Sequence, residues 1–186
     1  MDNIEELRHS VLALKEFGTS RLRIASIPGL SFGFVTLPVA SRVLEVEPWL
    51  TTEAVCLLPA AHPLAGKARI DIEDLRDQHL VISNQPSIST NPLLELIARH
   101  GIQIAGKTEA NIGTISALVA NGVGITVMNP VTARDQLSPR DEVVVRPFCP
   151  AITFSFGLVY RGEWKQSRVL AFLRDRGKAL MADYRD

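Results

Sequence analysis

Neutral hydroxyl, amide and proline residues recur in this sequence where apolar, strand-like runs end. Hydroxyl and amide groups hold small polar ligands by hydrogen bonds, and α/β proteins bind such ligands beyond the carboxyl ends of their strands. The candidate ligand-binding residues are Ser26, Ser31, Thr36, Pro38, Asn84, Ser87, Thr114, Asn129 and Pro130. Because they are spread along the chain, the sequence predicts a site assembled from several strand ends.

The same residues have ordinary structural interpretations. Ser26 and Ser31 are typical of turns, and residues 84–90 are typical of a solvated polar loop. Asn129 followed by Pro130 fits a simple turn after a strand. The residue types alone allow both interpretations.

The histidines and glycines give no sign of catalysis or of a cofactor. His62, His79 and His100 have no Ser, Cys or carboxylate at the spacing of a known catalytic or metal site. Residues 122–124, Gly-Val-Gly, precede a strand-like run instead of following one, so they are no dinucleotide-binding fingerprint. The sequence therefore predicts no catalytic residue, no metal site and no cofactor.

The charge balance disfavours nucleic acid as a direct partner. The chain has 186 residues with 20 Lys+Arg and 20 Asp+Glu, a formal net charge of +0. DNA-binding proteins usually carry a basic surplus, because neutralisation of phosphates dominates their affinity. The arginines of the carboxyl-terminal third lie among acidic residues. We expect no sequence-specific DNA binding by this chain alone.

The hydrophobic segments and the cysteines predict an ordinary cytoplasmic domain. No run approaches the ~18 apolar residues that a membrane span needs, and the charged residues 1–8 are unlike a signal peptide. Cys56 and Cys149 form no CxxC motif, so we predict two buried free thiols.

Strand-like and helix-like segments alternate, which predicts a mainly parallel α/β fold. Helical segments are expected over residues 2–17, 70–75, 93–100, 111–121, 131–136 and 167–184. Strands are expected over residues 21–27, 34–38, 44–50, 53–59, 79–83, 102–109, 122–128, 143–148 and 153–159, with a loop over 28–33 and a turn at 51–52. Asn111 is predicted to cap its helix, and Thr114 then lies in the first turn. Residues 91–128 are expected to form half of a doubly wound sheet.

Several segments resemble the LysR-type transcriptional regulators. The similar segments are residues 7–17 (end of the linker helix), 22–25 (first strand), 50–65, LTTEAVCLLPAAHPLA (crossover between the lobes), 72–75 and 80–82 (next turn and strand), and 118–130 (helix-to-strand signature). No single motif is specific, but their order and spacing extend over nearly the whole chain.

The resemblance implies a two-lobed domain of periplasmic-binding-protein type II with Rossmann-like lobes. Residues 1–18 would end the linker helix, residues 19–51 and 148–186 would form the first lobe, and residues 52–147 the second. A small effector would bind between the lobes and shift their angle. The DNA-binding helix-turn-helix of the family is not in this sequence, so DNA would be a partner only of the full-length regulator.

The resemblance also implies partners. We expect a small polar effector, such as an amino acid or an organic acid, because the candidate groups are neutral and polar. Full-length members of the family are homo-oligomers, but the first-lobe residues that could pair are among those missing from this chain.

The first lobe is shorter than the family pattern. Only residues 28–33 separate two strand-like runs, whereas a parallel crossover needs a dozen or more residues. Roughly forty residues are absent near positions 31–34, since a βαβ unit takes about 30 or more. An internal deletion, residues omitted from the sequence, or a hairpin would each account for this.

Two other functions use the same scaffold. An enzyme such as a dehydratase would need an acid–base pair in the cleft, and a solute-binding protein would need an export signal. We find neither in the sequence. For the second lobe we expect Ile82, Leu118, Ile125 and Val127 to be buried.

Overall fold

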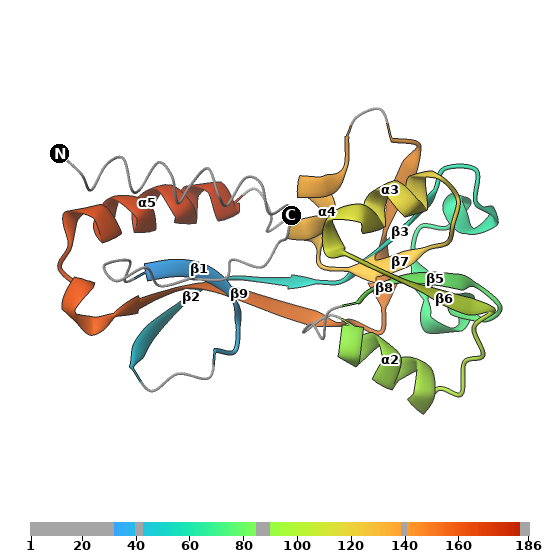
Figure 1. The fold of residues 1–186 in the computed structure, drawn as a ribbon, viewed down its shortest axis with the longest axis horizontal. Coiled ribbons are helices and arrows are strands. Elements are labelled where there is room, and N and C mark those ends of the chain that lie inside the picture. Colours follow the sequence, from blue (N-terminus) through green and yellow to red (C-terminus); the bar gives the residue numbers. More distant parts are fainter. Residues whose placement is uncertain (1–31, 40–42, 85–89, 139–140, 183–186) are drawn as a thin grey trace.

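The computed structural model describes residues 32–39, 43–84, 90–138 and 141–182 (Figure 1). The expected helix over residues 2–17 and the expected strand over residues 21–27 lie outside these ranges. The same holds for three candidate ligand-binding residues, Ser26, Ser31 and Ser87. Their roles stay predictions.

A three-stranded sheet forms one end of the described chain, with the strand order β1-β9-β2 (Figure 1). Both β1 (Phe32–Leu37) and β2 (Leu44–Glu53) run antiparallel to β9 (Thr153–Arg161). Helix α5 (Arg168–Ala182) follows β9 after a short 3-10 turn, η4 (Gly162–Trp164), and lies over this sheet.

A small apolar cluster holds α5 on the sheet. It consists of Trp49, Leu158, Tyr160 and Leu170, all buried, with Phe34 and Trp164 packed against them. The large buried residues Phe154, Phe156, Leu158 and Tyr160 occupy every second position of β9, as expected for a strand with one face toward a core.

The other end of the chain is built on a second set of strands. The order is β4-β8-β3-β7, and β5 pairs with β6. The bounds are β3 (Val55–Pro59), β4 (Ile70–Asp71), β5 (His79–Ser83), β6 (Gly106–Ala110), β7 (Thr126–Met128) and β8 (Val143–Cys149). A parallel bridge between Leu80 and Ile125 joins β5 to β7.

Helices cover both faces of this second set of strands (Figure 1). Helix α2 (Thr90–Arg99) lies on one face, and α3 (Ile115–Ala120) and α4 (Pro130–Gln136) lie on the other. Short 3-10 turns η1 (Pro63–Gly66), η2 (Ile72–Leu75) and η3 (Ile112–Thr114) complete it. The order β5-α2-β6-α3-β7 with helices on opposite faces confirms the doubly wound half predicted for residues 91–128.

The two faces have separate cores. The α2 side buries Ile82, Ile125 and Val127, as the sequence predicted. On the α3 side, Leu118 is only half-buried and packs against the edge of that core. The buried positions of α3 are Ile115, Ser116 and Val119, so the prediction of burial is wrong for Leu118 alone.

Two short connections join the sheets, and both lie at one junction. Strand β2 continues into β3 through Ala54, while β8 continues into β9 through residues 150–152. Ala54 N donates a hydrogen bond to Ile152 O (2.8 Å), and Phe148 N donates one to Ala54 O (3.2 Å). Because Phe154 and Phe156 share a core with the second set of strands, the apolar packing is continuous across the junction.

Two expectations about the strands are wrong. Among the described strand pairs, β1–β9, β2–β9, β3–β7 and β3–β8 are antiparallel, and only β4–β8 and β5–β6 are parallel ladders. The sheets are not mainly parallel because β9 returns between β1 and β2. The turn expected at residues 51–52 does not exist, since Thr51 and Thr52 stay in β2 and pair with Ser155 and Phe154 of β9.

Other element boundaries move by a few residues. Strand β1 begins at Phe32, inside the loop expected over residues 28–33. Strands β6 and β7 begin at Gly106 and Thr126, later than expected. Gly101 ends α2 with a φ of 62°, a left-handed conformation that favours glycine.

Candidate ligand-binding site

The strand directions bring the described candidate residues to the junction between the sheets. Strand β1 is parallel to β2, because both are antiparallel to β9, so its end at Leu37 points the same way as the end of β2. Strand β3 continues in that direction from Ala54, and β7 runs against β3. The carboxyl end of β7 therefore returns toward the end of β1.

The ends of β5, β6 and β7 lie at one edge of their sheet. Ser83 pairs with Ala110 in the parallel ladder, and Asn84 N donates a hydrogen bond to Ala110 O (2.9 Å). The bridge from Leu80 to Ile125 puts Asn84 and Asn129 at the same level, four residues farther along each strand. Adjacent strands are ~5 Å apart, so the first residues after these three strands form one row.

Thr36 and Pro38 approach this row from the first sheet. Thr36 is half-buried opposite Phe156, and Pro38 is exposed immediately after β1. Asn84 is also exposed. Three of the candidates thus lie at strand ends that point toward the junction, Thr36 and Pro38 on the first sheet and Asn84 on the second.

Asn129 is engaged in local structure. It is the N-cap of α4: its Oδ1 accepts a hydrogen bond from Thr132 N, and its Nδ2 donates one to Thr132 Oγ1, both at 2.8 Å. Thr114 is exposed and its hydroxyl donates to Asn111 O (2.8 Å). Asn111 caps η3, as predicted, with its side chain accepting from Gly113 N (3.0 Å).

Pro130 is the first residue of α4, directly after its cap Asn129. It lines an open apolar groove of about 340 Å³ between α4 and β8. The other residues that line this groove are Ala133, Arg134, Leu137, Ser138 and Val145. Among the described candidates, Pro130 alone lines this groove.

One polar group near the junction, the hydroxyl of Thr52, is not among the residues predicted for the site. Thr52 is 7% exposed, and its Oγ1 is the only buried side-chain nitrogen or oxygen without a hydrogen-bond partner among the described residues. Because a turn was expected at residues 51–52, Thr52 was not predicted to be a buried strand residue. The alternation of Leu50, Thr52 and Ala54 is the signal that places Thr52 on the buried face of a strand.

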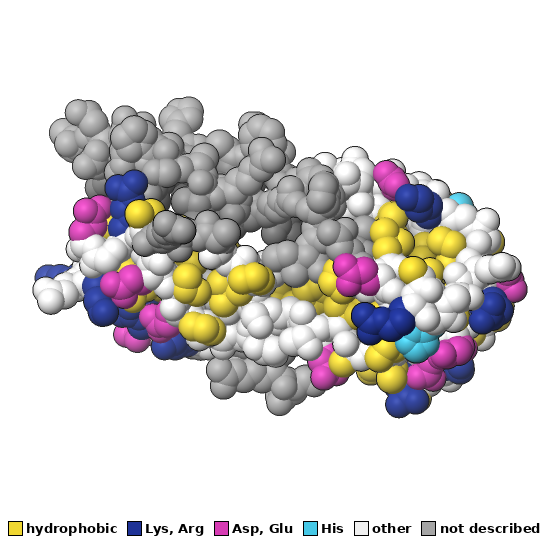
Figure 2. Space-filling model, turned by 90° about the horizontal axis from the view of Figure 1, so that it is seen from below, with side chains coloured by type: hydrophobic (Ala, Val, Ile, Leu, Met, Phe, Trp, Pro, Cys, Tyr) yellow, Lys and Arg dark blue, Asp and Glu magenta, His cyan; other side chains and the backbone are white. Residues whose placement is uncertain are grey.

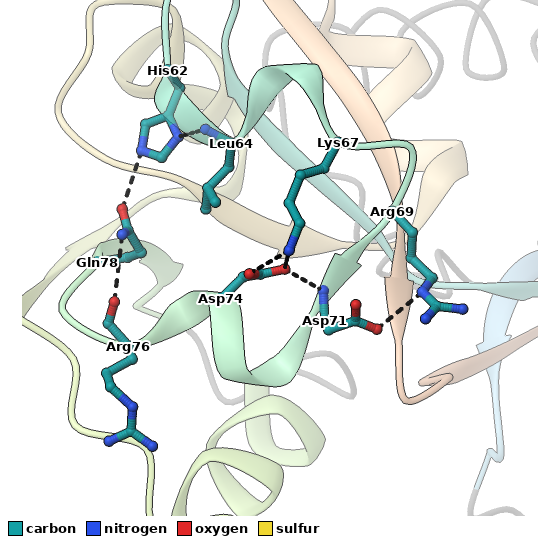
Figure 3. Close-up of polar contacts among 8 residues, drawn as sticks. All are labelled: His62, Leu64, Lys67, Arg69, Asp71, Asp74, Arg76 and Gln78. Atoms are coloured by element: carbon teal, nitrogen blue, oxygen red, sulfur yellow. Dashed lines mark hydrogen bonds and ion pairs between the residues drawn. The ribbon is translucent and has the colours of Figure 1, made fainter.

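Lys67, Asp71 and Asp74 form a cluster of charged residues that looks like a functional site, but their contacts stabilise the fold. In Figure 3, Lys67 Nζ lies 2.6 Å from Asp74 Oδ1, and Asp71 N donates to Asp74 Oδ2 (2.9 Å). Burial alone would raise the pKa of Asp74, but the hydrogen bonds from Lys67 and from the Asp71 backbone outweigh it and lower this pKa. These contacts fix the turn η2 and engage the Asp74 carboxylate in the fold.

Histidines in the second set of strands also serve the fold. His62 accepts a hydrogen bond from Leu64 N (3.2 Å) and lies 3.1 Å from Gln78 Oε1, as Figure 3 shows. His79 Nε2 lies 2.8 Å from Thr108 Oγ1, which links β5 to β6. In the part of the chain that the structure describes, no group of three or more His, Cys, Asp or Glu could hold a metal ion.

Charges of both signs are mixed on the surface. On the face shown in Figure 2, Lys and Arg lie among Asp and Glu and form no single basic patch. Ion pairs such as Lys107–Glu109 and Arg69–Asp71 account for part of this mixing. Within the described ranges, no helix combines the length and apolarity that crossing a bilayer requires.

Comparison with known proteins identifies relatives over most of the chain. Residues 9–180 match the family described as the LysR substrate binding domain. The transcriptional activator protein LysR of Escherichia coli is 31% identical over 111 residues, which cover 59% of this chain and 35% of the activator. The regulatory protein NocR of Agrobacterium tumefaciens is 25% identical over 154 residues, covering 82% and 51% of the two chains. The chain thus spans about a third to a half of the length of these relatives.

Solved structures show the same fold. The reduced OxyR regulatory domain from Pseudomonas aeruginosa superposes with a TM-score of 0.65 at 25% identity, covering 82% of this chain and 72% of that one. The Synechocystis CcmR regulatory domain, solved in complex with 2-PG, gives a TM-score of 0.66 at 22% identity over 84% and 74% of the chains.

Proposed function

Because this chain belongs to the LysR substrate binding domain family, we propose that it is the small-molecule-sensing domain of a transcriptional regulator. The observation that supports this best is the meeting of strand ends at the junction between the sheets. Thr36 and Pro38 come from β1, and Asn84 comes from β5. Ligands bind at such strand ends and between such units in α/β proteins.

The proposed organisation has two lobes. Residues 19–51 and 148–186 form the first lobe, residues 52–147 form the second, and residues 1–18 end a linker helix. The connections at Ala54 and at residues 150–152 lie a few residues beyond these bounds and support a junction in this region. An effector that contacts both lobes favours one angle between them, and the angle is passed on to DNA-binding domains.

The proposed partners follow from this role. The effector is a small polar molecule, such as an amino acid or an organic acid, because the described groups at the strand ends are hydroxyl, amide and backbone groups. The DNA is bound by another part of the full-length regulator, which acts as a homo-oligomer in the cytoplasm. The formal net charge of +0 supports the assignment of DNA binding to another part.

We propose no catalytic role. An enzyme on this scaffold needs a positioned acid or base, and the described candidate residues, Thr36, Pro38, Asn84, Thr114, Asn129 and Pro130, include no carboxylate, His, Lys or Cys.

A thermal-shift screen of amino acids and organic acids against the purified chain tests the proposal. We expect one chemical class to raise Tm in a concentration-dependent way. The stabilising compounds are then incubated with the chain and the mixture is assayed for turnover. Binding without conversion supports a sensor, conversion of the compound supports an enzyme, and a screen in which nothing raises Tm contradicts ligand binding by this chain.

A further inference from the structure

We propose that the Thr52 hydroxyl is a specificity-determining group of the ligand site and that it hydrogen-bonds a neutral polar atom of the effector. This inference rests on the proposed function. It starts from the finding that Thr52 Oγ1 is buried without a partner, although buried polar groups are nearly always hydrogen-bonded. Valine has the same shape and would avoid the desolvation cost of a buried, unpaired hydroxyl.

The position of Thr52 links the hydroxyl to the junction. Thr52 pairs with Phe154 on β9 and lies two residues before Ala54, where β2 passes into β3. Both backbone groups of Ala54 are held by hydrogen bonds to Ile152 and Phe148. Thr52 therefore lies beside a hydrogen-bonded connection between the two sheets.

Thr52 lies on the same face of the sheet as the candidate Thr36. Thr36 pairs with Phe156, which pairs with Leu50, and Thr52 is the next residue of β2 on that face. Thr36 stands at the open end of β1, whereas Thr52 is covered. The two hydroxyls thus lie on one face of the sheet, that of Thr36 partly exposed and that of Thr52 covered.

The neighbours of Thr52 define the chemistry of its partner. The residues on its face of the two strands include Leu50, Ala54 and Phe154, which are apolar and buried. A charged ligand atom is costly in such surroundings unless it is paired, whereas a neutral hydroxyl, carbonyl or amide needs only one hydrogen bond. Thr52 thus selects ligands that carry a neutral polar atom over analogues that lack it, because the analogue leaves the hydroxyl unpaired.

Matched ligand pairs test this assignment. The pairs are L-serine with L-alanine, glycolate with acetate, and lactate with propionate, each added to the full chain while Tm is recorded. We expect the hydroxylated member of at least one pair to raise Tm more than its partner in the wild-type chain. Thr52→Val should abolish the difference, and Thr52→Ser, which keeps the hydroxyl, should retain it.

Two control variants separate this role from general effects on folding. Thr51→Val changes the exposed neighbour on the opposite face and should preserve the discrimination. Without ligand, Thr52→Val should raise Tm by about 2–4 °C, because an unpaired buried hydroxyl is removed. Thr132→Val should lower Tm, because the Thr132 hydroxyl accepts a hydrogen bond from Asn129 Nδ2.

Each outcome decides the assignment. Equal stabilisation by both members of every pair, or discrimination that survives in Thr52→Val, overturns the role of Thr52 and leaves the sensor function standing. A Thr52→Val chain that loses stability without ligand overturns the premise that the hydroxyl is unpaired. A wild-type chain that no compound of the pairs or of the wider screen stabilises overturns both the proposed function and this inference.

Discussion

Glu47 on β2 and Arg174 on α5 form an ion pair in which Arg174 Nε lies 2.7 Å from Glu47 Oε2. Lys178 Nζ lies 2.6 Å from Glu47 Oε1, and Trp49 Nε1 donates to the same oxygen (3.2 Å). These contacts tie α5 to the strand that continues into the second set of strands. Burial alone would raise the pKa of Glu47, but the hydrogen bonds from Lys178, Arg174 and Trp49 outweigh it and lower this pKa.

Glu47→Gln should lower the free energy of unfolding by about 1–2 kcal/mol, measured by urea denaturation, because it removes the charge that two cations and an indole share. The matched control is Glu163→Gln. The Glu163 carboxylate is 65% exposed and lies 4.0 Å from Arg161, so its loss should cost at most about 0.5 kcal/mol. Equal losses in the two variants would contradict a special role for Glu47.

The lowered pKa values of Glu47 and Asp74 predict acid sensitivity. A carboxyl whose pKa is lower in the folded state binds protons more readily when the chain is unfolded. Its contribution to stability is complete above the ordinary values of 4.5 for Glu47 and 3.8 for Asp74, and it is lost as the pH falls through the lower folded-state values. Urea midpoints between pH 6 and ~3 should fall less steeply in Glu47→Gln than in the wild-type chain.

Gly177 of α5 packs against the Trp49 side chain of β2. A Cβ at this position would overlap the ring of Trp49, which is buried. Alanine normally stabilises a helix relative to glycine by about 1 kcal/mol, but here the overlap should reverse the sign. We expect Gly177→Ala to lower the urea midpoint.

Two further variants test the cause of that loss. Gly66→Ala places a methyl group in open space and should change stability by a few tenths of a kcal/mol at most. Trp49→Leu combined with Gly177→Ala should be less destabilised than the sum of the single variants, because the smaller side chain removes the overlap. Strict additivity would mean that the Trp49 ring does not cause the loss.

Elements that depend on local sequence were predictable. The strand over residues 79–83 has the predicted bounds, and Gly101 ends α2 where expected. In both cases a run of apolar residues indicates the element, and the residue that follows the run disfavours its continuation. The doubly wound half was predictable for the same reason, since short loops and alternating elements leave few ways to connect parallel strands.

Pairing between distant strands was not predictable. Thr51 is in β2 because it pairs with Ser155, 104 positions away, and their hydroxyls lie 3.4 Å apart. Two adjacent threonines before a glutamate look like a turn when only neighbours are considered. A similar limit applies to Asn129: the sequence predicted a strand end or a turn there, whereas the structure shows that its side chain caps α4.

The two thiols should differ in reactivity. Cys56 is fully buried, and burial, followed by the negative charge of Asp74, raises the pKa of its thiol to about 12. Cys149 is only partly buried. Because the thiolate is the reactive form, iodoacetamide at pH 8 should label Cys149 in the native chain and leave Cys56 unmodified. Labelling of Cys56 without denaturant, read by peptide mass spectrometry, would contradict its burial.

Asn129 should contribute to stability through its cap of α4. Asn129→Ala removes the acceptor for Thr132 N and the donor to Thr132 Oγ1, so we expect a loss of about 0.5–2 kcal/mol in urea denaturation. Asn129→Ser keeps a capping oxygen and should retain most of the stability, since serine caps helices about as well as asparagine. If serine and alanine cost the same, the cap is not the source of the effect. If neither variant is destabilised, the side chain of Asn129 is free to serve the ligand site instead.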